Sequence, residues 1–432
     1  MTTWTNWAGT VRTDVTVVTP ASVAELCSVV AAAAQRGQQV KPIGAGHSFT
    51  AIGATGGVQL RLDRLAGLVR ADRETGLVTA LAGTRLHALN EALWQLGLSM
   101  TNLGDIDAQT IAGAISTGTH GTGLRYGGIA TQVRGLELVL ADGSLLRCTP
   151  DENPDVFSAA RVGLGALGVI ATVTLQCEPA FALAAAEGPA PLDAVLDELD
   201  ENVLGNDHFE FYWFPHTRRV LTKRNNRVLP QTALRPLPRF RHWLDDEFLA
   251  NRVFDGVNRL TTRRPALIPQ MNALASRLLS GRDYIDRSHR VFASPRRVLF
   301  REMEYAVPRN TVPEVLGEID AYLDRSGEHV GFPVEVRFAA ADDIWLSTAY
   351  ERETGYVAVH QYHRRGHDSY FAAVESIAAD VGGRPHWGKI HYRTADSLRA
   401  SYPRFDEFRA VRDKLDPQRV FGNEYLSRVL GD

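Results

Sequence analysis

Hydrophobic positions in the first 180 residues follow two alternating spacings. The stretch LCSVVAAAAQR has helical spacing, begins just after Ser22 and Glu25, which have capping-box spacing, and ends at Gly37. VKPI (40–43) follows as a strand, and LVTALAG, LELVLADGSLLRC and GVIATVTLQC (168–177) have strand character. The dipeptide Asp142-Gly143 predicts a hairpin turn within the third of these stretches. The pattern therefore predicts a first domain over residues 1–180 that mixes helices and strands.

The pattern changes after about residue 181. ALAAAEGPAPLDAVLDELD indicates a connection into a helix, and TVPEVLGEIDAYLDR (311–325) is helical. HFEFYWF (208–214), REMEYAV, FPVEVRF and YVAVHQY have strand character, whereas the stretch 218–300, rich in arginine and proline, has no clear assignment. From Pro385 the chain returns to short elements, with helices over FDEFRAVRDKL and FGNEYLSRVL. Strands grouped with helices between them predict an antiparallel sheet flanked by helices over 181–384.

Composition limits the function classes. With 432 residues, the chain is long enough for two domains, and a net charge of −3 provides no basic field for nucleic acid. Three widely spaced cysteines favour a reducing compartment over a disulfide framework, and the 13 histidines lack metal-site spacing, so no metal is expected. No signal peptide or run of about 18 apolar residues is found, so a cytoplasmic location is expected. Peripheral membrane contact stays open.

Two glycine-rich stretches carry the first chemical signal. GAGHS (44–48) follows the VKPI strand but lacks the lysine of a Walker loop, and Phe49 occupies the third glycine position of a dinucleotide fingerprint. Alone, it favours a structural turn. GDIDAQTIAGAISTGTHGTG (104–123) is built of small residues and hydroxyls, and a helix starting near Thr110 would aim free amides at a diphosphate. Tight helix–sheet packing explains its glycines but not its four threonines and serine, so the two stretches together favour an extended dinucleotide.

A third motif gives the two loops a context. PHWGK (385–389) is a rare combination, and it follows GHS and TGTHG in chain order. With the WTNW start, GALGVI (165–170), FPVEVRF and the FGNEY end, the chain resembles the vanillyl-alcohol oxidase superfamily of FAD enzymes. Within that superfamily it is similar to aldonolactone oxidoreductases, of the L-gulono-1,4-lactone dehydrogenase and D-arabinono-1,4-lactone oxidase type, and to their alditol oxidase relatives.

The resemblance implies an α+β, two-domain FAD-binding fold of the PCMH type. Residues 1–180 and 385–432 would bind FAD, and 181–384 would form a cap domain. His47 would carry FAD covalently on the flavin 8α-methyl group; the alternative is a hydrogen-bonding histidine beside noncovalent FAD. The cofactor-binding residues implied are Ile43, Gly44, Ala45, Gly46, His47, Ser48, Gly104, Asp105, Thr110, Gly113, Gly118, Thr119, His120, Gly121, Ile170, His386 and Asn423.

Candidate catalytic residues lie on the cap strands. In FPVEVRF, Glu335 and Arg337 share one strand face, which would be a solvated ion pair if the sheet were exposed. The resemblance implies instead that this pair grips substrate, with Arg337 and Lys389 as catalytic cations aimed at a developing alkoxide. Packing and substrate contact are equally favoured for Tyr356, His360 and Tyr362, and no carboxylate base is evident. The substrate-binding residues implied are Thr110, Glu335, Arg337, His360 and Lys389.

The activity implied is oxidation of the secondary hydroxyl of an aldono-1,4-lactone by hydride transfer to flavin N5. L-gulono-, L-galactono- and D-arabinono-1,4-lactone are the candidate substrates, and the product would be of the ascorbate type. Oxygen or another electron acceptor would reoxidise the flavin. The alternatives are an alditol oxidase acting on xylitol- or sorbitol-type polyols, and a noncatalytic flavin or electron-transfer protein.

Overall fold

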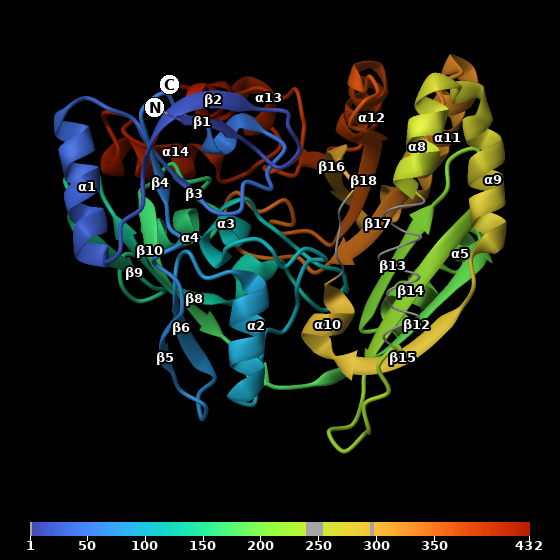
Figure 1. The fold of residues 1–432 in the computed structure, drawn as a ribbon, viewed down its shortest axis with the longest axis horizontal. Helices are drawn as coiled ribbons and strands as arrows, with labels where there is room; N and C mark the ends of the chain where they lie inside the picture. Colours follow the sequence, from blue (N-terminus) through green and yellow to red (C-terminus); the bar gives the residue numbers. More distant parts are fainter. Residues whose placement is uncertain (1, 239–253, 294–297) are drawn as a thin grey trace.

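The structure is a computed structural model that describes residues 2–238, 254–293 and 298–432. Parts of the arginine-rich stretch 218–300 therefore lie outside the described residues. Figure 1 shows two halves side by side: one built from the N-terminal sheets and the C-terminal helices, the other from a large sheet with helices on its outer side. No helix in the described ranges has both the length and the apolar character needed to cross a bilayer.

The first half contains two sheets around the largest hydrophobic core. One has the order β1-β2-β4-β3, with β4 parallel to both β2 and β3; the other is antiparallel, in the order β5-β6-β10-β8-β9. Their strands are β1 (Thr2–Thr5), β2 (Arg12–Val18), β3 (Val40–Ile43), β4 (Val58–Arg61), β5 (Leu68–Ala71), β6 (Leu77–Leu81), β8 (Val133–Val139), β9 (Leu145–Cys148) and β10 (Val169–Gln176). β7 (Leu98–Ser99) pairs with β11 (Glu178–Pro179).

Two helices of this half begin close to where the sequence predicts. Its helices are α1 (Val23–Gln35), α2 (Leu86–Gln95), α3 (Ile111–Ser116) and α4 (Pro154–Ala160), with 3-10 turns η1 (Ala51–Gly53) and η2 (Ile129–Gln132). The predicted ones are α1 and α3, whereas α2 and α4 were not predicted. Ser22 Oγ accepts a hydrogen bond from the Glu25 amide at 3.1 Å, which confirms the predicted start of α1. The hairpin predicted at Asp142-Gly143 joins β8 to β9, and Gly143 adopts the positive φ of 83° that such a turn needs.

The second half is an eight-stranded antiparallel sheet in the order β15-β12-β14-β13-β17-β18-β16-β19. Its strands are β12 (Ala182–Pro191), β13 (His208–Trp213), β14 (Arg219–Arg227), β15 (Arg282–Arg287), β16 (Phe300–Pro308), β17 (Val334–Ala339), β18 (Thr354–Tyr362) and β19 (Arg384–Pro385). Its helices are α5 (Leu192–Asp197), α6 (Leu199–Gly205), α8 (Phe254–Arg263), α9 (Ile268–Leu278), α10 (Ser288–Phe292), α11 (Val312–Ser326) and α12 (Asp368–Asp380), with turns η4 (Pro265–Leu267) and η5 (Arg309–Thr311).

Alternation along the central strands divides the large sheet into an apolar and a polar face. Val334, Val336 and Phe338 of β17 pack into the core formed with α11 and α12, as the sequence predicts. Glu335 and Arg337 therefore point to the opposite face, which lies against the first half and is also buried. The reading of these two charges as a solvated pair is thus excluded.

One prediction about this half is wrong. Residues 182–191 form the ten-residue strand β12 rather than a connection into a helix. The strand pairs with β14 along its whole length and with β15 over its first six residues, so neighbouring strands outweigh the weak β preference of its alanines. Pro189 and Pro191 fall where β15 no longer pairs, so their missing N–H groups leave no gap on that side.

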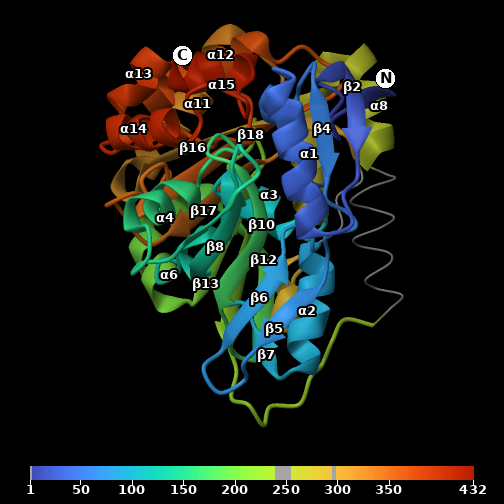
Figure 2. The ribbon, with the colours of Figure 1, turned by 90° about the vertical axis from the view of Figure 1, so that its left-hand side faces the viewer.

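The C-terminal segment joins the two halves. It leaves the large sheet through β19, which pairs with β16, and then forms α13 (Ala395–Arg399), α14 (Phe405–Leu415) and α15 (Glu424–Leu430). Leu398, Phe408 and Leu426 from these helices belong to the core of the first half. Figure 2 shows these helices beside α1 and β4, and the Val40 amide of β3 donates to the Val420 carbonyl at 2.8 Å. The helix predicted over 405–415 is confirmed, and the one predicted over 421–430 is confirmed from Glu424 onward.

Candidate active site

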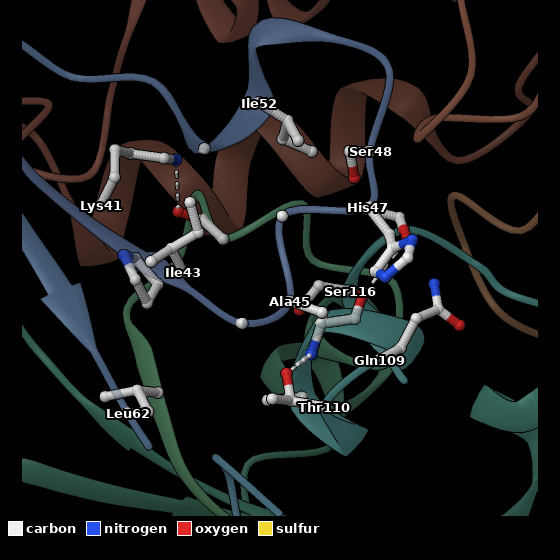
Figure 3. Close-up of a pocket in the computed structure, with 18 of the residues that line it drawn as sticks. Lys41, Ile43, Ala45, His47, Ser48, Ile52, Leu62, Gln109, Thr110 and Ser116 are labelled. Atoms are coloured by element: carbon white, nitrogen blue, oxygen red, sulfur yellow. Dashed lines mark hydrogen bonds between the residues drawn. The ribbon is translucent and has the colours of Figure 1, made fainter. Parts of the chain in front are cut away.

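A cavity in the first half runs along the GHS loop (44–48), next to α3 (Figure 3). Lys41 and Leu62 lie toward one end, whereas His47 and Gln109 lie toward the other. Among the cofactor residues that the resemblance implies, those lining this cavity are Ile43, Gly44, Ala45, Gly46, His47, Ser48, Thr110, Gly113 and Ile170. Trp4, Lys41 and Gln109 also line it, although the sequence did not single them out.

The GHS loop presents unused backbone donors to this cavity. Within the described part of the chain, no backbone amide from Ala45 to Ser48 donates to a protein oxygen. A Cβ on Gly44 would lie 2.2 Å from Thr110 Oγ1, so glycine is required for the loop to lie this close to the start of α3. Consecutive free amides on a cavity wall fit an anion such as a diphosphate.

His47 lies at one end of this loop and faces Trp7, with ring centroids 5.4 Å apart and an interplanar angle of 24°. Burial, together with the nearby charges of Lys389 and Arg85, lowers the pKa of His47 to about 4. The imidazole is therefore neutral at physiological pH, with a ring nitrogen available as a nucleophile.

The start of α3 differs from its prediction. Thr110 is the N-cap residue, as expected, but the first amides of the helix are already bonded within the protein. The Ile111 amide donates to the Thr84 carbonyl at 2.9 Å, and the Gly113 amide donates to Thr110 Oγ1 at 3.3 Å. The prediction that this helix end aims free amides at a diphosphate is therefore wrong, because carbonyls of the turn after β6 and the cap side chain use those donors.

Gln109 offers a polar atom that the protein leaves unpaired. Its Nε2 donates to Thr119 Oγ1 at 3.2 Å, whereas its buried Oε1 has no partner among the described residues. An orphaned acceptor on a cavity wall is costly unless a ligand donates to it. Free amides along the GHS loop and this carbonyl at the His47 end together fit FAD, which carries a diphosphate and a ring system with an N–H donor.

The remaining small-residue positions lie behind the cavity wall. Gly104, Gly118, Thr119 and Gly121 are absent from the lining. A Cβ on Gly121 would lie 2.1 Å from the Leu103 carbonyl oxygen, and one on Gly104 would lie 3.0 Å from the His120 carbonyl oxygen. These glycines let the segment at Leu103–Gly104 pack closely against the segment at His120–Gly121. The latter segment places His120 at the polar face of the large sheet.

Arg337 lies at the centre of that face. Its Nε donates to Glu210 at 2.9 Å, and its Nη2 bonds Glu335 and lies 3.4 Å from Asp105. Lys223 also bonds Glu210, at 2.8 Å. Burial alone would raise the pKa of Glu210, but Lys223 and Arg337 hold it at about 2. Asp105 thus binds the cap arginine rather than lining the cavity.

Two glutamates of β16 form the second part of this face, and the sequence reading missed both. Glu302 bonds Lys389 through one oxygen and lies 3.5 Å from His360 Nε2 through the other. Glu304 lies 3.1 Å from His120 Nε2. Burial opposes the ionised form of each carboxyl, yet Lys389 lowers the pKa of Glu302, and His120 lowers that of Glu304. No carboxylate base was evident from the sequence, and Glu302 beside Lys389 is a carboxylate that the sequence pattern did not single out.

His386 and Asn423 lie on the C-terminal segment. Together with His120 and Glu304, His386 offers ligand atoms within 4.8 Å of one another, but its Nδ1 already accepts the Gly388 amide at 3.0 Å. Burial lowers the pKa of His386 to about 4, so its ring is neutral. Asn423 caps α15, and its amide nitrogen donates to the carbonyls of Ala51, Ile52 and Ala54.

Carboxylates outnumber lysines and arginines on the polar face. Its five carboxylates are Asp105, Glu210, Glu302, Glu304 and Glu335, and its lysines and arginines are Lys223, Arg337 and Lys389. Carboxylates thus outnumber these cations by two. A buried cluster with uncompensated charge is unfavourable. His120 Nε2 and His360 Nε2 each face one glutamate of this cluster, at 3.1 Å and 3.5 Å.

The polar face and the cavity meet at the GHS loop. Lys389 Nζ lies 5.1 Å from the centre of the Phe49 ring, and the Phe49 amide donates to the Gly388 carbonyl at 2.7 Å. The charge of Lys389 also lowers the pKa of His47. Lys389 and the His47 end of the cavity therefore belong to one site. The arrangement places cations and carboxylates over the end of a cavity that fits a flavin.

Comparisons with known proteins agree with this geometry. The FAD binding domain family matches residues 15–149, and the D-arabinono-1,4-lactone oxidase family matches residues 173–429. Over its whole length the fold resembles cholesterol oxidase from Brevibacterium sterolicum, with a TM-score of 0.83 at 17% identity, covering 99% of this chain and 96% of that one. Fold and site thus define a flavoprotein with an FAD-binding domain and a cap.

Sequence relatives make the assignment narrower. The chain is 44% identical over 429 residues to L-gulono-1,4-lactone dehydrogenase of Mycobacterium tuberculosis, covering 99% of both chains. It is 37% identical over 417 residues to L-gulonolactone oxidase of Bos taurus (95% and 94% covered), and 32% identical over 439 residues to alditol oxidase of a Streptomyces species (99% and 98% covered). The chain belongs to the D-arabinono-1,4-lactone oxidase family.

Proposed function

We propose that this protein is an FAD-dependent oxidoreductase that oxidises the secondary hydroxyl of an aldono-1,4-lactone to an ascorbate-type product. The observation that carries the proposal is the buried cluster around Arg337 and Lys389, which stands over the His47 end of the cavity. L-gulono-, L-galactono- and D-arabinono-1,4-lactone are the substrates that fit the family. FAD, when bound, supplies the acceptor for the hydride.

The protein's own residues would bind and polarise the lactone. Glu335 and Arg337 present a carboxylate beside a planar cation, which suits adjacent hydroxyl groups of a sugar lactone. Lys389, held by Glu302, would donate a hydrogen bond to the oxygen that becomes the ketone. Donors fixed in advance stabilise charge as it develops on that oxygen, because they need no reorganisation in a water-poor site.

His47 would also bond the cofactor covalently. The ring is neutral, and it lies on the loop that also carries the free amides. Acid precipitation of the protein should then leave yellow flavin in the pellet, and a fluorescent band should survive denaturing electrophoresis. His47→Ala should release flavin under the same treatment. Wild-type protein that releases all of its FAD would refute the bond while leaving the flavoenzyme proposal intact.

Anaerobic flavin reduction tests the proposed substrate class. Purified protein is mixed with three aldono-1,4-lactones and with xylitol and sorbitol, and bleaching of the flavin absorbance is followed before air is admitted. Rapid bleaching by a lactone is expected, and the rate after admission of air tells whether oxygen is the acceptor. The 32%-identical alditol oxidase makes the polyols the relevant competitors. Faster reduction by a polyol than by every lactone would replace the proposal with that alternative.

A further inference from the structure

The WTNW stretch (4–7) and the turn that follows it lie against the GHS loop (44–48). Three carbonyls in and just after the loop accept hydrogen bonds from this N-terminal segment: the Trp7 amide bonds Gly46 at 2.8 Å, Asn6 Nδ2 bonds Ser48 at 2.9 Å, and Thr10 Oγ1 bonds Phe49 at 2.9 Å. The segment therefore holds the backbone of the loop through its carbonyls, whereas the amides described above stay unused.

The side chain that holds the loop is itself held. Asn6 is 4% exposed, and its Oδ1 accepts the Val11 amide at 3.0 Å. Gly46 adopts a φ of 69°, in the left-handed region that glycine tolerates best. With its carbonyls bonded to the N-terminal segment, the loop keeps consecutive amides available to an anion in the cavity.

The imidazole of His47, which lines the cavity (Figure 3), depends on a different contact. Neither of its ring nitrogens bonds a protein atom in the described part of the chain. Its ring stacks on Trp7, with centroids 5.4 Å apart and 24° between the planes. Trp7 in turn packs edge-on against Phe49 and Phe300. Since an offset stack between aromatic rings restricts the plane of each, Trp7 sets the orientation of the His47 ring.

We propose that Trp7 is the positioning residue for attachment of FAD to His47: its indole holds the imidazole in the orientation from which a ring nitrogen bonds the flavin 8α-methyl carbon. This inference rests on the proposed covalent bond. The net change breaks one C–H bond of the methyl group and the imidazole N–H bond, and forms one N–C bond. Two protons and two electrons are released, and dissolved oxygen accepts them as hydrogen peroxide. Trp7 takes no part in these transfers and acts through the alignment of the attacking nitrogen.

The share of flavin that becomes attached tests this assignment without substrate turnover. Wild type, Trp7→Leu and Trp7→Phe are produced under one condition and sampled at a series of times. Acid precipitation then separates attached flavin in the pellet from free FAD in the supernatant. Trp7→Leu should bind as much total flavin as the wild type but attach it about 10²-fold more slowly, because the attacking nitrogen is no longer aligned. Trp7→Phe should restore attachment, because it returns a flat ring to the same position.

Two controls separate orientation of the ring from support of the fold. Trp94→Leu removes another half-buried indole that contacts a histidine, with 5.7 Å between its ring centroid and that of His289, and it should attach flavin like the wild type. His47→Ala leaves no ring to orient, so adding Trp7→Leu to it should not change the content of noncovalent FAD.

Two results would overturn the inference while leaving the covalent bond in place. One is attachment in Trp7→Leu at the wild-type rate. The other is an equal loss of total flavin when Trp7→Leu is added to the wild type and to His47→Ala, since Trp7 would then support the binding loop rather than the ring. Release of all FAD by the wild type would refute the bond, and this inference with it, but not the proposed oxidation.

Discussion

The histidines show how single hydrogen bonds assign different properties to the same side chain. His47 is held neutral by burial and by nearby cations, which suits a nucleophilic nitrogen. Burial also lowers the pKa of His386, whose Nδ1 accepts the Gly388 amide, so this ring acts as a neutral support for the turn before Lys389. His120 and His360 have Nδ1 against a carbonyl and Nε2 against a carboxylate. Both nitrogens of each of these two rings therefore lie beside an oxygen acceptor.

Arg337 gives a prediction at the same scale. Its guanidinium bonds Glu210, Glu335 and Asp105 at once, and a single ammonium cannot reproduce that planar set of donors. Arg337→Lys should keep bound flavin and its spectrum but slow anaerobic flavin reduction by about 10²-fold or more. Arg227→Lys is the matched control, because the Arg227 guanidinium also binds a carboxylate through two nitrogens: it makes a bidentate salt bridge with Glu178, outside the polar face. Equal rates for the two variants would show that Arg337 takes no part in catalysis.

At the scale of elements, strand alternation predicted much of the site. It placed Glu335 and Arg337 on one face of FPVEVRF, and the structure puts that face over the site. The same alternation runs through REMEYAV and HFEFYWF, where Glu302, Glu304 and Glu210 alternate with buried apolar residues. These glutamates could have been found by the same rule. Two of their partners could not, because His120 and Lys389 reach them from distant segments, and local patterns carry no information on such pairings.

Other elements were set by tertiary context. Alanine, glycine and proline disfavour strands, so β12 was read as a connection; only its pairing with β14 and β15 makes it a strand. The short helix α3 was located correctly from Thr110, but its amides bond the carbonyl of Thr84, in the turn after β6, and the side chain of Thr110 itself. Sequence thus predicted where elements begin more reliably than which of their polar groups stay free.

The cap of α15 provides a prediction for this scale. Asn423 accepts from the Leu426 amide at 2.8 Å while its Nδ2 donates to three carbonyls around η1, so it holds the C-terminal helix against the segment after the GHS loop. Asn423→Ala should lower the free energy of unfolding by roughly 2–4 kcal/mol, from the lost cap and the unpaired carbonyls, and should reduce flavin content. Ser22→Ala, at the exposed cap of α1, should cost only about 1 kcal/mol. Urea unfolding of both variants compares them; equal losses would mean that the carbonyl contacts contribute nothing.

At the scale of the whole molecule, the site exists only because three parts of the chain meet. The first half supplies the cavity, the large sheet supplies the charged face, and the C-terminal segment carries Lys389 between them. Lys41 joins two of these parts from the cavity wall. Its Nζ donates to the Gly165 carbonyl at 3.1 Å and to the Phe421 carbonyl at 2.9 Å, and the residue is 1% exposed.

Burial lowers the pKa of Lys41 to about 7, although Asp416 acts in the opposite direction. In the unfolded chain this lysine keeps its ordinary pKa near 10.5, so between pH 7 and pH 10.5 the unfolded state binds more protons than the folded state. Lys41 should therefore make the free energy of unfolding rise with pH across that window, by on the order of 1 kcal/mol per pH unit. Below pH 7 both states are protonated, and its contribution no longer depends on pH.

Lys41→Met removes this titration while filling similar volume. We expect the melting temperature of the wild type to increase relative to that of the variant from pH 7 to pH 9. This direction follows from the lowered pKa of Lys41 in the folded protein. Lys414→Met, at an exposed position of α14, should follow the wild type at every pH. Thermal unfolding in a series of buffers of equal ionic strength measures all three proteins. Parallel curves for the wild type and Lys41→Met would mean that Lys41 stays fully protonated in the folded protein. A buried ammonium group, rather than an amine that titrates near neutral pH, would then link the cavity wall to the C-terminal segment.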